Sequence, residues 1–319
     1  SHKNTFTAYP PLAQIIFMLT RGVGSGVYPL KIVFVFFDLG TMVLLVLILK
    51  ELKINTLNIA IYAWNPLAIM EIAGSGHMDI CAIFWIMLAV FLYLKRKGLL
   101  VPIALLLSVL TKLFAIPALL FYVRNMRSKK NILIPILGVL FYLPFAKAGY
   151  NVFKGAVHYL TLWEFNGSIF PVLLFLTKSY TVSKAIASLV LVLLFAYLFL
   201  KRIDFPKATF ILFGSILIMS PTVHPWYLLW ILPFLCIYER LSWLLLTGTI
   251  FFSYSVLTGY YYLGEWNEAW PVRLLVYVTF YSVILWEFLP NLKSSVFLHK
   301  KNLTKTGSRK ISFHKSGSL

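Results

Sequence analysis

Long apolar runs recur along almost the whole chain, and they limit what it can fold into more than any other feature. Many of these runs are about 17 to 25 residues long, the length of helix that spans the hydrocarbon core of a bilayer. Charged residues make up only 12% of the 319 residues and hydrophobic residues 60%, whereas a soluble domain carries about 25% charged residues. The sequence therefore predicts an all-α, polytopic bundle of transmembrane helices.

The hydrophobic pattern predicts about nine spans and several shorter pieces. The spans are expected at residues 30–50, 57–73, 79–94, 131–147, 182–200, 208–221, 226–238, 242–259 and 271–289. Prolines inside several of them predict kinked or broken helices. Residues 11–20 and 169–177 are too short to cross and are expected to be re-entrant or interfacial. Residues 99–122 are interrupted by a polar stretch that ends at Lys112, so we expect two half-helices that enter and return.

The net charge of +19 is gathered in short basic clusters at the ends of the apolar runs. These clusters lie at residues 50–53, 95–97, 124–130, 201–207 and 293–315. Clusters of this kind mark cytoplasmic loops, and we expect them to touch anionic lipid rather than nucleic acid. The chain is thus expected to be a multi-pass protein of the cell membrane. Residues 1–290 would form one transmembrane domain, and residues 291–319 a basic, disordered cytoplasmic tail.

With this topology, the remaining polar residues collect on the non-cytoplasmic side, where four stretches break the apolar pattern. They are TAYPPLAQ at 7–14, YAWNPLAIMEIAGSGHMD at 62–79, LTLWEFNGSIF at 160–170 and SPTVHPWYLLW at 220–230. Because this side is both polar and chemically varied, we expect it to carry the function.

These stretches also have a purely structural interpretation. Trp and Tyr at the ends of spans commonly form a belt at the lipid interface. His224 can pack at a helix end, and Asp79 can cap the span that follows it. Glu71, Asp38 and Lys112 lie inside apolar runs, where a charge costs at least about 2.5–3.5 kcal/mol. We therefore expect each of these three side chains to face a partner or a wet cavity.

The residue types on this side suit a sugar that is carried on a lipid phosphate. Carboxylates and histidines bind hydroxyls or act as bases, and Lys and Arg bind phosphate. Aromatic faces stack on sugar rings or prenyl chains. The sequence contains no nucleotide-binding loop and no HExxH motif. The candidate donor-binding residues are His224, Tyr227, Trp226, His77, Asp79, Glu71, Lys112, Asn166, Arg273 and Tyr9.

Four stretches also carry a resemblance to a known family. They are YPPLAQ at 9–14, YAWNPLAIMEIAGSGHMD at 62–79, LTKLFAIP at 110–117 and SPTVHPWYLLWILPF at 220–234. In this order they resemble the bacterial and archaeal polyprenol-phosphate-mannose-dependent mannosyltransferases, which are integral membrane enzymes of the GT-C superfamily. The resemblance covers roughly residues 7–240.

The resemblance implies a GT-C-like fold and an inverting transfer of mannose. The sugar would pass from a polyprenyl-phosphate donor to a glycolipid or glycan acceptor on the non-cytoplasmic side. No organic cofactor is implied, and the use of a divalent metal stays undecided.

One feature of the family is not matched. Its first external loop carries a general-base aspartate in an Asp-x-x-Arg-Tyr context, but no aspartate precedes Asp38 here. We therefore expect the base upstream of Ser1, with Asp79 as the fallback. A transporter or flippase of a lipid-linked sugar, and a non-catalytic membrane subunit, are the alternative hypotheses.

Overall fold

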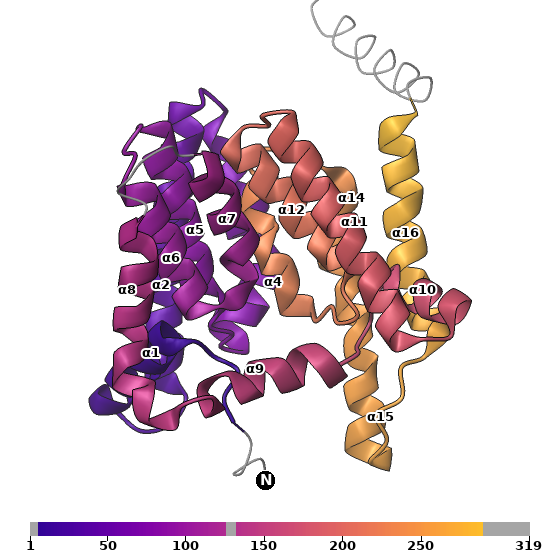
Figure 1. The fold of residues 1–319 in the computed structure, drawn as a ribbon. Helices are drawn as coiled ribbons and strands as arrows, with labels where there is room; N and C mark the ends of the chain where they lie inside the picture. The colour runs from indigo at the N-terminus through magenta and orange to yellow at the C-terminus, as the bar shows by residue number, and fades with distance from the viewer. Residues whose placement is uncertain (1–5, 126–131, 290–319) are drawn as a thin grey trace, which may run out of the picture.

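The computed structural model describes residues 6–125 and 132–289, and its regular structure is helical (Figure 1). No β-strand forms in these two ranges. Four helical segments are long and apolar enough to cross a membrane: α2 (Tyr28–Glu51), α11 (Tyr180–Leu200), Leu241–Leu263 and α16 (Trp270–Phe288). This length and composition indicate a membrane protein. The expected tail and most of the basic cluster at 124–130 lie outside the described residues.

The other helices are shorter and, apart from the one at residues 151–162, fall close to the predicted apolar segments. They are α1 (Pro11–Val23), α5 (Asp79–Leu94), α6 (Leu100–Thr111), α7 (Ile116–Asn125), α8 (Leu133–Tyr142), α9 (Asn151–Leu162), α10 (Phe170–Thr177) and α12 (Phe205–Met219). The segment Leu241–Leu263 consists of α14 (Leu241–Thr249), η7 (Ile250–Tyr254) and α15 (Ser255–Leu263). The prediction of about nine spans is matched only in part, because several of these helices are too short to cross a bilayer alone.

The segment predicted to span at 57–73 is broken into short turns, as Pro66 suggests. Its pieces are η1 (Thr56–Ile59), α3 (Ala60–Ala63), α4 (Pro66–Ala68) and η2 (Ile69–Gly74), the last a π-helix. Asn55 and Asn65 cause two of the restarts, because each side chain accepts a hydrogen bond from the backbone N–H two residues ahead. Such Asx contacts compete with a continuous helix and start a new one.

Residues 99–122 form two helices with a break between them, as predicted. Helix α6 ends at Thr111, and Lys112 has an extended backbone that interrupts the helix before η3 (Leu113–Ala115) and α7. The hydroxyl of Tyr122, in α7, donates to the carbonyl of Gly98, just before α6 begins. Since the end of α7 lies beside the start of α6, the two helices are antiparallel and Lys112 is at their tip.

A sharp bend follows α8. Helix α8 continues into η5 (Leu143–Ala148), and the chain then turns by 101° into α9. Helix α9 therefore runs across one end of the bundle, at the lower side of Figure 1. The N-terminal segment passes close by, since a Cβ at Gly155 would clash with backbone carbonyls of Phe6 and Thr7.

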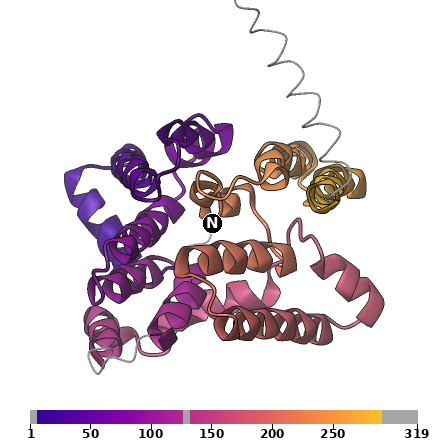
Figure 2. The same cartoon turned by 90° about the horizontal axis from the view of Figure 1, so that it is seen from above.

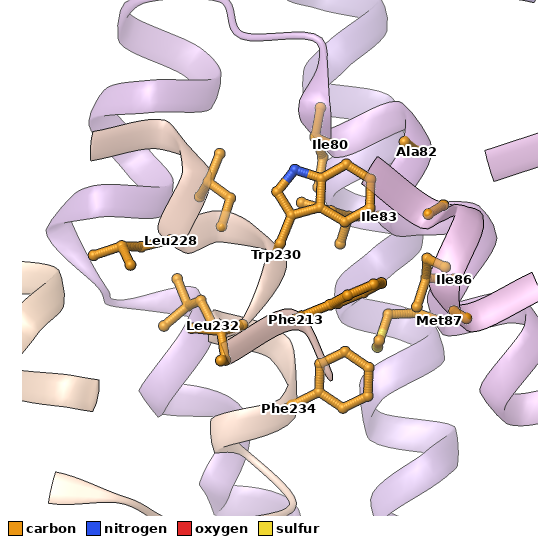
Figure 3. Packing of buried hydrophobic residues seen from close by; sticks show 14 of the residues in the cluster. Ile80, Ala82, Ile83, Ile86, Met87, Phe213, Leu228, Trp230, Leu232 and Phe234 are labelled. Carbon is orange, nitrogen blue, oxygen red and sulfur yellow. The ribbon is translucent and has the colours of Figure 1, made fainter. Parts of the chain in front are cut away.

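The core forms where α5 meets the short helices of residues 225–235. Here η6 (Pro225–Trp230) and α13 (Leu232–Leu235) lie between the two halves of the chain, and they contact both (Figure 2). The Trp230 ring is fully buried and meets Phe213 at 90°, with ring centroids 5.4 Å apart (Figure 3).

Small residues let α5 and α6 approach closely. Ser108 donates a hydrogen bond to the Ala82 carbonyl over 2.8 Å, and both residues are fully buried. In lipid, apolar side chains gain little by leaving the solvent, so close packing and interhelical hydrogen bonds of this kind hold helices together.

The two ends of the bundle differ in charge. The Lys95–Glu51 ion pair joins the ends of α5 and α2, and Arg124, near the end of α7, lies over the Phe199 ring, near the end of α11. These contacts bring together loops that contain the predicted basic clusters. The opposite end carries α9, the lower part of α15 and the candidate site.

Candidate functional site

The polar residues singled out in the sequence meet at the end of the bundle that α9 crosses. They come from the N-terminal segment before α1, η2 and the loop after it, the start of α5, the tip of the α6–α7 hairpin, and η6 with the loop before it. We call this group the end cluster. It consists of Tyr9, Glu71, His77, Asp79, Lys112, His224, Trp226, Tyr227 and Trp230.

Glu71 lies on the π-helical turn η2 and is only 1% exposed. Its Oε2 is 3.2 Å from His77 Nε2, and its Oε1 accepts a hydrogen bond of 2.8 Å from the Tyr254 hydroxyl. Gly76 makes the approach of His77 possible, because its backbone has φ +80°, a conformation that favours glycine. The expectation that Glu71 faces a partner is confirmed, and π-helical turns are frequent at functional sites.

Asp79 is the first residue of α5, and Met78 occupies the cap position. The structural interpretation of Asp79 as a helix cap is therefore wrong. Its carboxylate is 1% exposed, and Oδ1 accepts from Trp230 Nε1 over 2.7 Å and from Lys112 Nζ over 2.5 Å.

Lys112 is the partly exposed cation of the end cluster. Its side chain is 19% exposed, and Nζ lies 4.8 Å from the centre of the Tyr227 ring. The Asp79 carboxylate and this ring together satisfy the lysine that the sequence placed in an apolar run. Asp38 is satisfied in the same way, because the Tyr62 hydroxyl donates to it over 2.6 Å.

Four aromatic rings form a column through the end cluster. Trp226 lies nearly parallel to His77 and to His224, with ring centroids 3.9 Å and 4.2 Å apart. Two rings at these distances fit only on opposite faces of the indole. Phe165 then lies against His224 at 4.8 Å. Both faces of Trp226 are covered, so this ring is not free to stack on a sugar.

The segment after His224 is a 3-10 helix rather than an α-helix. Trp226 and Trp230 therefore do not lie one α-helical turn apart on a shared face, and Trp226 stacks between two histidines. Trp230 instead points into the core and donates to Asp79.

His224 is a buried, neutral side chain. It is 7% exposed, and burial lowers its pKa from 6.5 to about 3, with further lowering from the nearby charges of Lys112 and His77. Both causes disfavour the imidazolium ion. His224 can therefore give or accept a hydrogen bond at neutral pH, but it supplies no positive charge there.

Two tyrosines extend the end cluster toward α9 and the N-terminal segment. The Tyr227 hydroxyl is hydrogen-bonded to that of Tyr159, in α9. Although 36% of Tyr9 is exposed, its hydroxyl lies inside, next to Asp79 and Tyr159. Burial, and then the negative charge of Asp79, raise the pKa of Tyr9 to about 12. Each hydroxyl is thus a neutral hydrogen-bond donor.

Asn166 and Arg273 belong to a neighbouring group rather than to the end cluster. The Asn166 N–H donates to Glu268 Oε2 over 2.7 Å, and Arg273 Nη2 donates to the same oxygen over 2.5 Å. Asn166 Nδ2 also reaches the Val223 carbonyl at 3.4 Å, and the Val223 N–H donates to Phe165. This group therefore fixes the backbone that leads to His224.

The sequence analysis missed several partners. Tyr254, Trp230, Phe165 and Glu268 all contact candidate residues, but none was chosen as a site residue. A signal existed only for Trp230, because a buried indole N–H needs an acceptor. Among the described residues, no group of three His, Cys, Asp or Glu side chains is arranged to hold a metal ion.

Comparison with known proteins adds no relative. No family model, no curated protein and no solved structure matches this chain.

Proposed function

We propose that this protein is a multi-pass membrane glycosyltransferase. It transfers mannose, with inversion, from a polyprenyl-phosphate donor to a glycolipid or glycan acceptor on the non-cytoplasmic side of the cell membrane. The observation that best supports this proposal is the position of Lys112. It offers one partly exposed cation at the tip of a hairpin, beside hydroxyl and imidazole donors, at the end of an apolar bundle.

The donor phosphate binds at Lys112 in this proposal. An ammonium group has three donors, and Asp79 takes one of them. The Tyr227 and Tyr9 hydroxyls and the neutral His224 ring add donors of the kind that bind phosphate and sugar oxygens. A buried charge-assisted hydrogen bond of this kind contributes roughly 1.5–3 kcal/mol.

Trp226 has a supporting role in this proposal. It separates His77 from His224 and fixes the planes of both rings. The sugar ring is then held by hydrogen bonds rather than by stacking on the indole. Glu71 Oε2 lies 3.2 Å from Nε2 of His77.

The orientation follows from the charge of the two ends. The basic clusters gather at the end that carries Lys95 and Arg124, which is therefore cytoplasmic under the positive-inside rule, together with the C-terminal tail. The end cluster then faces the opposite side. In an inverting transfer, the acceptor oxygen forms a bond to the anomeric carbon, the bond to the donor phosphate breaks, and a general base takes the hydroxyl proton. In this proposal the end cluster binds the donor, and no residue is assigned as the general base.

A binding experiment tests this role. The purified chain in lipid nanodiscs is titrated with polyprenyl-phosphate-mannose, and binding is followed by native mass spectrometry. The double variant Lys112→Met/Asp79→Asn removes the cation without leaving a bare buried carboxylate. We expect it to bind the donor roughly 10- to 100-fold more weakly, since each 1.4 kcal/mol is a factor of about ten.

The control is Lys95→Met, which removes a lysine at the other end and should leave binding unchanged. Equal binding by the double variant and the wild type would reject the donor site at Lys112. A flippase would instead move the labelled donor across a proteoliposome membrane without any acceptor.

A further inference from the structure

A cavity next to the end cluster has no role in the proposed function. Its volume is about 240 Å³, and it lies between the N-terminal segment and the bent pair η5–α9. The residues that line it are Phe6, Thr7, Tyr9, Pro11, Gln14, Phe145, Ala148, Asn151 and Val152. Only Tyr9 belongs to the end cluster, so the cavity is separated from Lys112 and Asp79 by this tyrosine.

The cavity suits hydrocarbon. An engineered apolar cavity of about 150 Å³ accepts benzene, so this one has room for on the order of ten carbon atoms. Two of its polar side chains are already paired, because Gln14 Nε2 donates to Thr7 Oγ1 over 2.8 Å. The surface that faces the cavity is therefore mainly apolar, and contact with it stabilises a bound alkyl chain.

Positive charge lies at the rim of the cavity. Residues 6–14 and 143–155, which supply its walls, contain Lys147 and Lys154 and no Asp or Glu. The Lys154 Nζ lies 5.2 Å from the centre of the Phe6 ring, and Lys147 is an exposed residue next to Ala148. A ligand with an anionic head and an apolar chain matches this distribution.

The bend at residue 149 explains why such a ligand would be present. Helix α9 leaves the direction of α8–η5 by 101° and exposes both apolar residues and Lys154. A helix of this composition lies in the plane of the membrane surface, at the depth where lipid chains begin. The cavity beneath it is then open to the lipids of the bilayer.

We propose that this cavity binds one anionic phospholipid, with a hydrocarbon chain among Phe6, Phe145 and Val152 and the phosphate against Lys154 and Lys147. The lipid holds α9 and the N-terminal segment together. The proposal does not depend on the glycosyltransferase function, since it uses neither Lys112 nor His224.

Native mass spectrometry of the full chain tests it. The protein is purified in mild detergent, stripped of lipid, and incubated with dioleoylphosphatidylglycerol or with dioleoylphosphatidylcholine. We expect one phosphatidylglycerol to be retained and phosphatidylcholine to be lost. Lys154→Glu should weaken retention at least about fivefold, because one lysine near a lipid phosphate contributes about that factor.

Val152→Trp should fill the cavity and abolish retention. The controls are Val172→Trp on the exposed side of α10 and Lys50→Glu at the end of α2, which should retain the lipid as the wild type does. If Val152→Trp fails to fold, the surface variant Lys154→Glu decides.

Three results would overturn the proposal: equal retention of both lipids, unchanged retention by Lys154→Glu, or displacement of the phosphatidylglycerol by an equimolar amount of polyprenyl phosphate. The last result would assign the cavity to the carrier chain of the donor. The first two results do not bear on donor binding at Lys112, which is measured with a different ligand and variant.

Discussion

The ion pair between Asp79 and Lys112 should be the most sensitive polar contact of the bundle. Asp79 Oδ1 is 2.5 Å from Lys112 Nζ, and the aspartate is buried while the lysine is 19% exposed. Lys112→Met leaves the carboxylate with the Trp230 indole as its remaining hydrogen-bond donor among the described residues. Breaking a buried pair in this way costs about 3–5 kcal/mol, because an uncompensated charge stays behind.

The partner substitution should cost less. Asp79→Asn keeps an oxygen that accepts from Trp230, and the freed Lys112 ammonium is partly exposed and can turn toward water. We expect a loss of about 1–3 kcal/mol. Once Asp79 is neutral, Lys112→Met no longer strands a charge, so the double variant should be more stable than Lys112→Met alone. The coupling energy of the cycle should exceed about 1 kcal/mol.

The assay is reversible unfolding in a fixed mixed micelle, followed by circular dichroism as the denaturing detergent is increased. The matched control is the double-mutant cycle of Lys95→Met and Glu51→Gln, which form an exposed ion pair. The coupling energy of this exposed pair should be less than about 1 kcal/mol. The reasoning is refuted if Lys112→Met costs no more than Lys95→Met, or if the costs at Asp79 and Lys112 simply add.

Three further predictions follow from the same structure. The His224 ring should stay neutral down to about pH 3, so its NMR resonances should not titrate between pH 7 and pH 5. Since the unfolded chain takes up this proton below about pH 6.5, the free energy of unfolding should fall as the pH drops from 6.5 toward 3. Titration of the His224 resonances near pH 6.5 would show that the ring is not buried as described. Gly155→Ala should destabilise the protein by about 1–3 kcal/mol, because the added methyl group clashes with the N-terminal segment. Gly248→Ala has open space around it and should stabilise its helix by about 0.5–1 kcal/mol. The melting temperatures of the two variants, measured in the same detergent, test both expectations. Cysteines placed at His77 and at Lys95 should react with an impermeant reagent from opposite sides of the membrane, and reaction from the same side would reject the orientation.

Much of the helical framework could be predicted from the sequence, because apolar length alone determines it in a membrane protein. Helix α5 begins and ends at the predicted residues 79 and 94, and the hairpin around Lys112 was recognised from the charge in the middle of an apolar run. Short-range interruptions were harder to predict. The π-helical turn at Glu71 and the 3-10 helix after His224 depend on tertiary packing, which no local pattern shows.

The site itself was predicted as a set of residues but not as an arrangement. The cost of burying charge showed that Glu71 and Lys112 need partners, and both have them. The identity of the partners could not be predicted, because Tyr254 and Trp230 are about 150 residues or more away in sequence from the carboxylates that they contact. The ring column also reversed the expected role of Trp226, since stacking geometry depends on three separate segments.

The neutral state of His224 leads to a last prediction. The ring is 7% exposed and lies between Trp226 and Phe165. A donor phosphate brings negative charge to the end cluster, and a nearby negative charge favours proton uptake by a base.

His224 should take no part in such proton uptake, because its ring is buried and its pKa is about 3. Calorimetry of donor binding at pH 7, in two buffers with different enthalpies of ionisation, measures the uptake directly. We expect the wild type and His224→Asn to take up the same number of protons, because the ring is neutral before and after binding. A smaller uptake by His224→Asn would show that the ring becomes charged in the complex, and the reasoning from its burial would then be wrong.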